Sequence, residues 1–74
     1  MDMRKLVARN LKKFRIDAGL SQEELAEQSG VDRTYISGIE RGVRNPTIVM
    51  LWQIASVLKI EPWQLIHPES ATDK

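Results

Sequence analysis

The chain has 74 residues, no cysteine and a formal net charge of +1. This length allows a single small domain, and the lack of cysteine excludes disulfides and thiolate metal sites as supports for it. The charge is unevenly distributed, because the span from Arg4 to Arg15 carries six basic residues and no acidic one. Two interpretations of that span stay open: a solvated helix face, or a surface from which one or two side chains reach a nucleic-acid backbone.

The sequence offers little for membrane insertion, metal binding or catalysis. No apolar run approaches the roughly 20 residues of a membrane span, and no signal-peptide core follows the basic start. His67 is the single histidine, no nucleophile is paired with a general base, and no glycine loop suits a phosphate. We therefore expect a soluble cytoplasmic protein that is not an enzyme and uses no metal, cofactor or small-molecule ligand.

The first predicted helix runs from about residue 3 to Ala18. Its apolar residues recur at intervals of three and four, as on one face of a helix, and Gly19 follows as a natural end. This apolar face consists of Met3, Leu6, Val7, Leu11 and Phe14.

The second predicted helix covers about residues 21–29. Ser21 is a good N-cap, because its hydroxyl can accept from a free backbone N–H in the first turn. Glu24 follows three residues later and completes a capping box. Gly30 suits the left-handed residue that ends many helices.

A third helix is predicted over about residues 32–41, with Asp32 as its N-cap and Gly42 as its end. The connection between the two helices is so short that they must cross sharply, as in a helix-turn-helix unit. Ile36, Ile39 and Val43 are spaced to face inward. The opposite, polar stripe consists of Arg33, Thr34, Ser37, Gly38 and Arg41, with Tyr35 at its edge.

This polar stripe suits the major groove of double-stranded DNA. Arg33 can donate two hydrogen bonds to guanine, and Thr34 offers a hydroxyl together with a methyl group for thymine. Tyr35 adds a ring and a phenol beside them. We therefore predict that Arg33, Thr34 and Tyr35 read base edges or local DNA shape.

The segments LSQEELAEQSGV, DRTYISGIERG and RNPT resemble the lambda-repressor-like (Cro/CI, XRE-type) helix-turn-helix family, from about Leu6 to Ile66. The segment DRTYISGIERGVRN further resembles the controller proteins of restriction–modification systems. The resemblance implies an all-α, compact five-helix DNA-binding domain, which we place at residues 1–67. Residues 68–74 have no apolar periodicity and are expected to form a flexible tail.

The resemblance also implies roles for individual residues. In the family, an arginine at the position of Arg15 commonly pairs with a glutamate at the position of Glu40, which favours a structural pair over a DNA contact. A glutamine at the position of Gln22 commonly binds a phosphate and braces the recognition helix. Gly38 stands where larger polar residues often occur, so one base contact is missing. The predicted DNA-backbone contacts are Gln22, Ser37, Arg41, Arg44 and Asn45.

Two acidic residues of the second helix, Glu23 and Glu27, have no capping task. In some family members that activate transcription, an acidic patch beside the DNA contacts RNA polymerase. A solubilising acidic face near a helix start is the alternative interpretation, and the sequence leaves both open.

The C-terminal part supplies an apolar cluster. Thr47 is the predicted N-cap of a fourth helix, and Pro62 suits the first position of a short fifth helix. A small core has limited room, so we expect part of this cluster to be exposed and to form a homodimer interface; a simple lid on the core is the alternative. The predicted interface consists of Trp52, Val57, Leu58, Trp63, Leu65 and Ile66.

These features predict a sequence-specific transcriptional regulator from a bacterium or phage. It would bind palindromic operators in double-stranded DNA as a homodimer, regulate its own gene, and serve as the controller of a restriction–modification system. The alternative from another class is an antitoxin or protein-interaction module with the same fold, whose C-terminal apolar cluster would hold a toxin.

Overall fold

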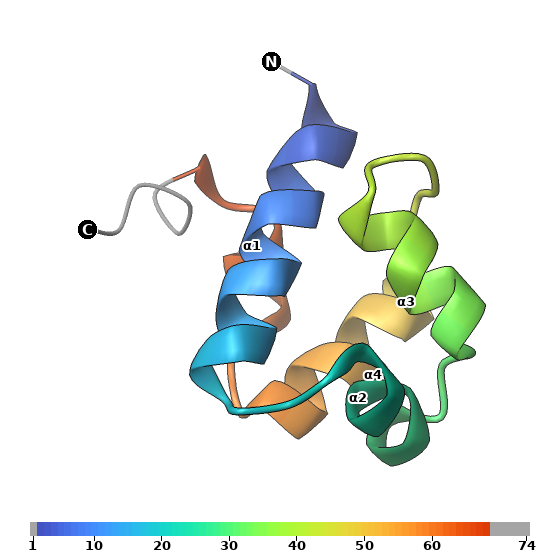
Figure 1. Cartoon of the computed structure of the whole chain (residues 1–74). Helices are drawn as coiled ribbons and strands as arrows, with labels where there is room; N and C mark the ends of the chain where they lie inside the picture. Colours follow the sequence, from blue (N-terminus) through green and yellow to red (C-terminus); the bar gives the residue numbers. More distant parts are fainter. Residues whose placement is uncertain (1, 69–74) are drawn as a thin grey trace.

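The computed structural model describes residues 2–68, and throughout this range the ordered elements are helices (Figure 1). The described part contains four α-helices, and the expected short fifth helix is a 3-10 helix, so the five-helix count is not matched exactly. A single four-residue segment that begins at a proline is short enough for the tighter 3-10 geometry. The elements are α1 (Met3–Asp17), α2 (Gln22–Ser29), α3 (Arg33–Glu40), α4 (Ile48–Leu58) and the 3-10 helix η1 (Pro62–Leu65).

The helix ends follow the predicted capping residues closely. The Ser21 hydroxyl accepts from the Glu24 N–H at 3.0 Å, and the Ser21 N–H donates to the Glu24 carboxylate at 2.8 Å, which confirms the capping box. Gly30 ends α2 in the left-handed conformation, at φ +80°. Asp32 caps α3 by accepting from the Thr34 N–H at 3.0 Å. The two helices therefore meet across the short connection that the sequence predicts.

The core lies where α1, α2, α3, α4 and η1 meet. Figure 1 shows α1 and α3 side by side, and α1 also packs against η1. Helix α2 packs against both α3 and α4. Burial of these apolar side chains supplies the main stabilisation of so small a domain. The core residues are Val7, Leu11, Leu25, Val31, Ile36, Ile39, Ile54, Ala55, Leu58 and Leu65.

Two residues expected on inward faces lie at the surface. Val43 is 56% exposed, because the α3 helix has already ended and the helical spacing no longer places it. Met3 is 49% exposed at the first residue of α1, where no neighbouring element covers it. Both predictions were wrong for the same reason: helical periodicity indicates burial only where another element packs against that face of the helix.

A buried polar side chain, Asn10, attaches the C-terminal segment to α1. Its side-chain amide donates to the backbone carbonyls of Leu65 at 3.0 Å and of His67 at 3.1 Å. Asn10 is fully buried in the described structure, so these bonds are protected from competing water. The lid formed by η1 is therefore fixed by hydrogen bonds as well as by apolar packing.

The predicted tail comprises residues 68–74; the described part ends at Pro68, so residues 69–74 of that tail lie outside the described residues. Between residues 2 and 68, no helix combines the length and the hydrophobicity that crossing a lipid bilayer requires.

Candidate nucleic-acid interface

The outer face of α3 begins with two exposed side chains, Arg33 and Thr34. Within residues 2–68 neither side chain forms a hydrogen bond or an ion pair. The Asp32 cap accepts only from the Thr34 backbone, so the Thr34 hydroxyl stays available. An arginine and a threonine at the open end of a helix can enter a groove and offer donors, an acceptor and a methyl group.

Tyr35 has a structural task that the sequence did not indicate. Its ring packs against the core, and its hydroxyl donates to the backbone carbonyl of Asn45 at 2.9 Å. The Arg44 guanidinium lies over the ring, 5.1 Å from its centroid, at a distance typical of a cation–π contact. Tyr35 therefore holds the loop after α3 against the helix that carries Arg33.

Gly38 lies beneath the Arg44 side chain. A Cβ atom at position 38 would stand 2.6 Å from the Arg44 Cδ and 2.8 Å from its Cγ, closer than real atoms approach. The outward position that Gly38 takes on the predicted stripe is thus filled by the Arg44 stem. The absence of a side chain at position 38 gives Arg44 the space to cross α3.

The opposite end of α3 is clamped to α1 and to the start of α2. Arg15 donates to the two Glu40 carboxylate oxygens at 2.6 and 3.1 Å, and also to the Leu20 carbonyl at 2.7 Å. The Gln22 amide donates to the same carboxylate at 3.1 Å. The Arg15 and Glu40 side chains are only 12% and 4% exposed. This geometry confirms the predicted structural pair and the brace at Gln22.

The remaining predicted backbone contacts share the exposed surface around α3. Arg41 donates to the Ser37 hydroxyl at 3.4 Å, one helical turn away. Arg44 and Asn45 are exposed in the loop that follows. Gln22 is half-buried at the first turn of α2, where free backbone N–H groups favour an anion.

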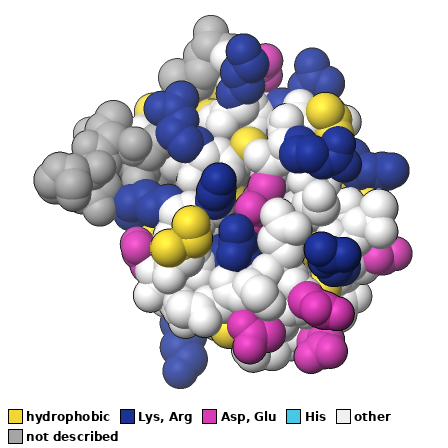
Figure 2. Space-filling model, viewed as in Figure 1, with side chains coloured by type: hydrophobic (Ala, Val, Ile, Leu, Met, Phe, Trp, Pro, Cys, Tyr) yellow, Lys and Arg dark blue, Asp and Glu magenta, His cyan; other side chains and the backbone are white. Residues whose placement is uncertain are grey.

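Charge is divided between the elements of this face. Figure 2 shows dark-blue Lys and Arg side chains over α1 and α3, and magenta Asp and Glu side chains at the lower right, near α2. Glu23 and Glu27 of α2 are both exposed. Among the described residues, no group of three or more histidine, cysteine or acidic side chains is placed to hold a metal ion.

The predicted apolar interface is only partly at the surface. Leu58 and Leu65 are 8% and 1% exposed and belong to the core, so their predicted place in the dimer interface was wrong. Leu65 is enclosed by Asn10 and by the helices around η1. Val57 is half-buried against the core. Trp52, Trp63 and Ile66 remain 65%, 54% and 42% exposed.

The sequence reasoning missed two further apolar residues, Ile48 and Val49, which are 85% and 65% exposed. Together with Trp52 they occupy positions i, i+1 and i+4 of α4 and therefore share one face. Their exposure could have been inferred from the sequence, because both residues lie outside the apolar stripe of α4 that faces the core.

Comparison with known proteins identifies a matching family and a similar sequence. The sequence matches the helix-turn-helix family HTH_3 over residues 11–62. It is 43% identical, over 97% of this chain and 94% of the other, to the uncharacterized HTH-type transcriptional regulator y4dJ of Sinorhizobium fredii.

Two solved structures are closely similar. The restriction–modification controller protein C.AhdI from Aeromonas hydrophila has a TM-score of 0.81 and 44% identity, over 84% of this chain and 94% of that protein. The biofilm master regulator SinR in complex with DNA has a TM-score of 0.80 and 35% identity, over 82% and 98% of the two chains.

Proposed function

Because the chain belongs to the HTH_3 helix-turn-helix family of transcriptional regulators, we propose that it recognises a specific DNA operator through the exposed start of α3. One observation carries this proposal: the Arg33 and Thr34 side chains are exposed and have no partner among residues 2–68, and the far end of their helix is clamped by the Arg15–Glu40 pair. A rigid helix keeps its reading side chains in place before DNA arrives, which reduces the ordering cost of binding.

Base reading is assigned to the first turn of α3. The Arg33 guanidinium donates to the O6 and N7 of guanine, while the Thr34 methyl contacts thymine. Tyr35 contributes at the edge of this surface and positions the following loop through its bond to Asn45. With Gly38 offering no side chain, DNA shape and deformability supply part of the specificity.

Phosphate contacts set the register of the helix in the groove. We assign them to Gln22 and the N-terminus of α2 on one side of α3, and to Ser37, Arg41, Arg44 and Asn45 on the other. Such contacts carry no sequence information, but they fix the orientation of the domain and make the affinity salt-dependent.

A homodimer on a palindrome is the proposed binding unit. A single domain of this size makes few base contacts, and two copies with recognition helices about 34 Å apart double them. The exposed apolar residues of α4 and the η1 region support this assembly, because such a patch on a small domain is suited to a partner. The proposed interface is Trp52, Trp63 and Ile66, extended by Ile48 and Val49, with Val57 at its margin.

The similarity to C.AhdI supports a role as the controller of a restriction–modification system that also regulates its own gene. In that role, we assign the RNA polymerase contact to Glu23 and Glu27; their exposure on α2 supports this assignment. The neighbouring genes test this role at once: a restriction endonuclease and a methyltransferase are expected beside this gene.

Selection of bound fragments from random double-stranded DNA tests the proposed function. Sequencing of the recovered DNA is expected to give one palindromic motif, and a duplex with that motif should outcompete random DNA in gel shifts. Recovery of unenriched DNA, with no preference for any duplex at low salt, would refute operator recognition.

A further inference from the structure

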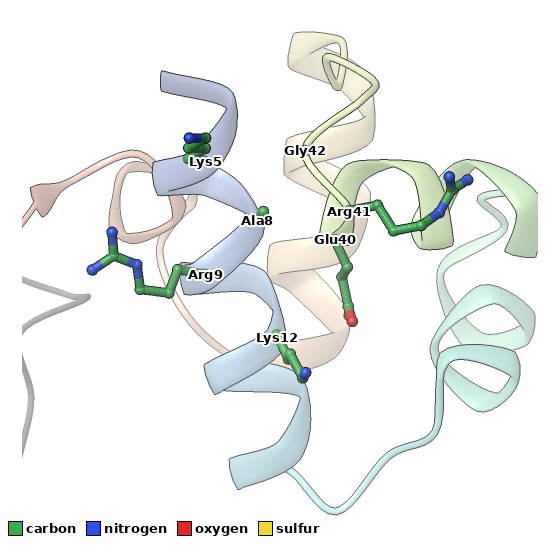
Figure 3. Close-up of a pocket in the computed structure, with 7 residues that line it drawn as sticks. All are labelled: Lys5, Ala8, Arg9, Lys12, Glu40, Arg41 and Gly42. Atoms are coloured by element: carbon green, nitrogen blue, oxygen red, sulfur yellow. The ribbon is translucent and has the colours of Figure 1, made fainter. Parts of the chain in front are cut away.

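A shallow groove of about 350 Å³ separates α1 from the end of α3 (Figure 3). Four of the seven residues that line it are basic, three of them from α1 and one from the end of α3. The lining residues are Lys5, Ala8, Arg9, Lys12, Glu40, Arg41 and Gly42.

The shape of this α1–α3 groove suits an extended anion. Ala8 and Gly42 are small, so the groove stays open between the two helices. In Figure 3, Lys12 extends from α1 toward the α3 side, whereas Arg9 and Arg41 point outward on opposite sides. Lys5 and Lys12 are two turns apart on one helix, roughly 10 Å along its axis. Lys5, Arg9 and Lys12 follow one another along this face of α1, so the positive charge on the α1 side of the groove is a row spread over about two turns.

The one acidic residue of the groove is already neutralised. The Glu40 carboxylate accepts from Arg15 at 2.6 and 3.1 Å and from Gln22 at 3.1 Å, and its side chain is 4% exposed. Within residues 2–68, no carboxylate lies within ion-pair distance of Lys5 or Lys12. The groove thus has an excess of positive charge that its own residues do not balance.

This row of like charges has a cost for folding. Lys5 and Arg9 are four residues apart on α1, and Arg9 and Lys12 are three apart, so both pairs repel each other across the helix surface. By contrast, the neighbouring Lys13 has an acidic partner one turn away, Asp17, at 3.8 Å. A polyanion bound along the groove would offset the repulsion within the row.

The groove is continuous with the proposed DNA interface. Arg41 belongs to both, and the carboxylate of Glu40 in the groove accepts from Gln22, the proposed phosphate contact on α2. We propose that the α1–α3 groove binds the DNA phosphate backbone beyond the bases read by α3, an inference that rests on the proposed function. Lys5 and Lys12 lengthen the contacted DNA without reading its sequence.

A pair of matched variants tests this inference. The double variant Lys5→Gln/Lys12→Gln removes two charges from the groove, and Lys13→Gln/Lys59→Gln removes two lysine charges from outside it. Affinity for the selected duplex is measured against salt concentration. The logarithm of the affinity falls as the logarithm of the salt concentration rises, and each lost phosphate contact reduces the magnitude of this slope by about 1. For the proposed dimer, which loses two contacts from each protomer, we expect a slope smaller in magnitude by about 4 in the groove variant and an unchanged slope in the control.

Phosphate ethylation interference gives the position of the contact. The wild-type protein is expected to show interference at phosphates flanking the base-read positions, and the groove variant should lose only that flanking signal. The conservative variant Lys5→Arg/Lys12→Arg should retain both the slope and the flanking signal. Circular dichroism confirms that all variants are folded.

Two results would overturn the inference while leaving operator recognition intact: equal slopes for the groove and control variants, or flanking interference that persists without Lys5 and Lys12. Failure of the proposed function has a different signature, because the wild-type protein would then prefer no duplex at all.

Discussion

Arg44 occupies the space that a side chain at Gly38 would need. The 2.6 Å approach between the Arg44 Cδ and a Cβ at position 38 means that the two side chains compete for one site on the outer face of α3. Because glycine leaves this site free, the Arg44 side chain crosses it, and its guanidinium lies over the Tyr35 ring.

Gly38→Ala should therefore displace Arg44 while the fold is kept. Alanine favours a helix interior over glycine by about 1 kcal/mol, and the obstructing atoms belong to a flexible exposed side chain, so the melting temperature should stay equal or rise. Operator affinity should fall, because Arg44 leaves its position beside Tyr35. Arg44→Ala is the matched comparison: if Arg44 placement explains the loss, the double variant will bind like Arg44→Ala alone. Unchanged affinity in Gly38→Ala would contradict this account.

Arg15→Ala should destabilise the domain by about 3 kcal/mol or more, because it leaves a nearly buried Glu40 carboxylate without its cation. Urea unfolding measures the change. Lys13→Ala is the control, since its pair with Asp17 is more exposed and worth about 0.5 kcal/mol or less. The apolar double variant Arg15→Met/Glu40→Leu should be less destabilised than Arg15→Ala, because it leaves no buried charge. Equal free energies of unfolding for Arg15→Ala and Lys13→Ala would mean that the Arg15–Glu40 pair does not stabilise the domain.

Arg33→Ala should lose roughly 1–3 kcal/mol of discrimination at one base pair of the operator. Gel shifts against single-position operator variants measure it. Arg41→Ala, which removes one proposed phosphate contact from each protomer, should instead weaken the affinity for all duplexes about equally and reduce the magnitude of the salt slope by about 2 for the dimer. A uniform loss for Arg33→Ala would make that residue a backbone contact.

Trp52→Glu should produce folded monomers that bind the operator weakly. Trp52 is 65% exposed, so a charge there is tolerated in the isolated domain, whereas at the centre of an interface it should weaken association by about 2 kcal/mol or more. Sedimentation equilibrium distinguishes the two states. Leu65→Glu is the contrasting variant: it places a charge in the core and should unfold the chain. A Trp52→Glu protein that remains dimeric would exclude this face as the interface.

Much of the fold could be predicted from local signals in the sequence. The Ser21–Glu24 capping box, the Gly30 end and the Asp32 cap each depend on residues within one turn, so local reasoning located α2 and α3 well. Arg15 and Glu40 are far apart in the chain, and only the family resemblance brought them together.

What could not be predicted depends on long-range packing. Nothing local distinguishes buried Leu65 from exposed Trp63, because the difference arises from how η1 folds back on α1. Asn10 looked like an ordinary polar residue, and its role needs carbonyls more than fifty positions away. Likewise, the space over Gly38 and the Tyr35 hydroxyl bond depend on the path of the loop after α3.

The bonds from Asn10 to the backbone near η1 have a consequence for the architecture of a dimeric complex. They join the segment that carries Trp63 and Ile66 to α1, and Arg15 joins α1 to α3. The segment with Trp63 and Ile66 and the helix α3 are thus both bonded to α1. In the proposed dimer, these bonds would set the distance and the angle between the two recognition helices. One extra base pair between the half-sites would shift them by about 3.4 Å and turn them by about 35°, a mismatch that these bonds oppose.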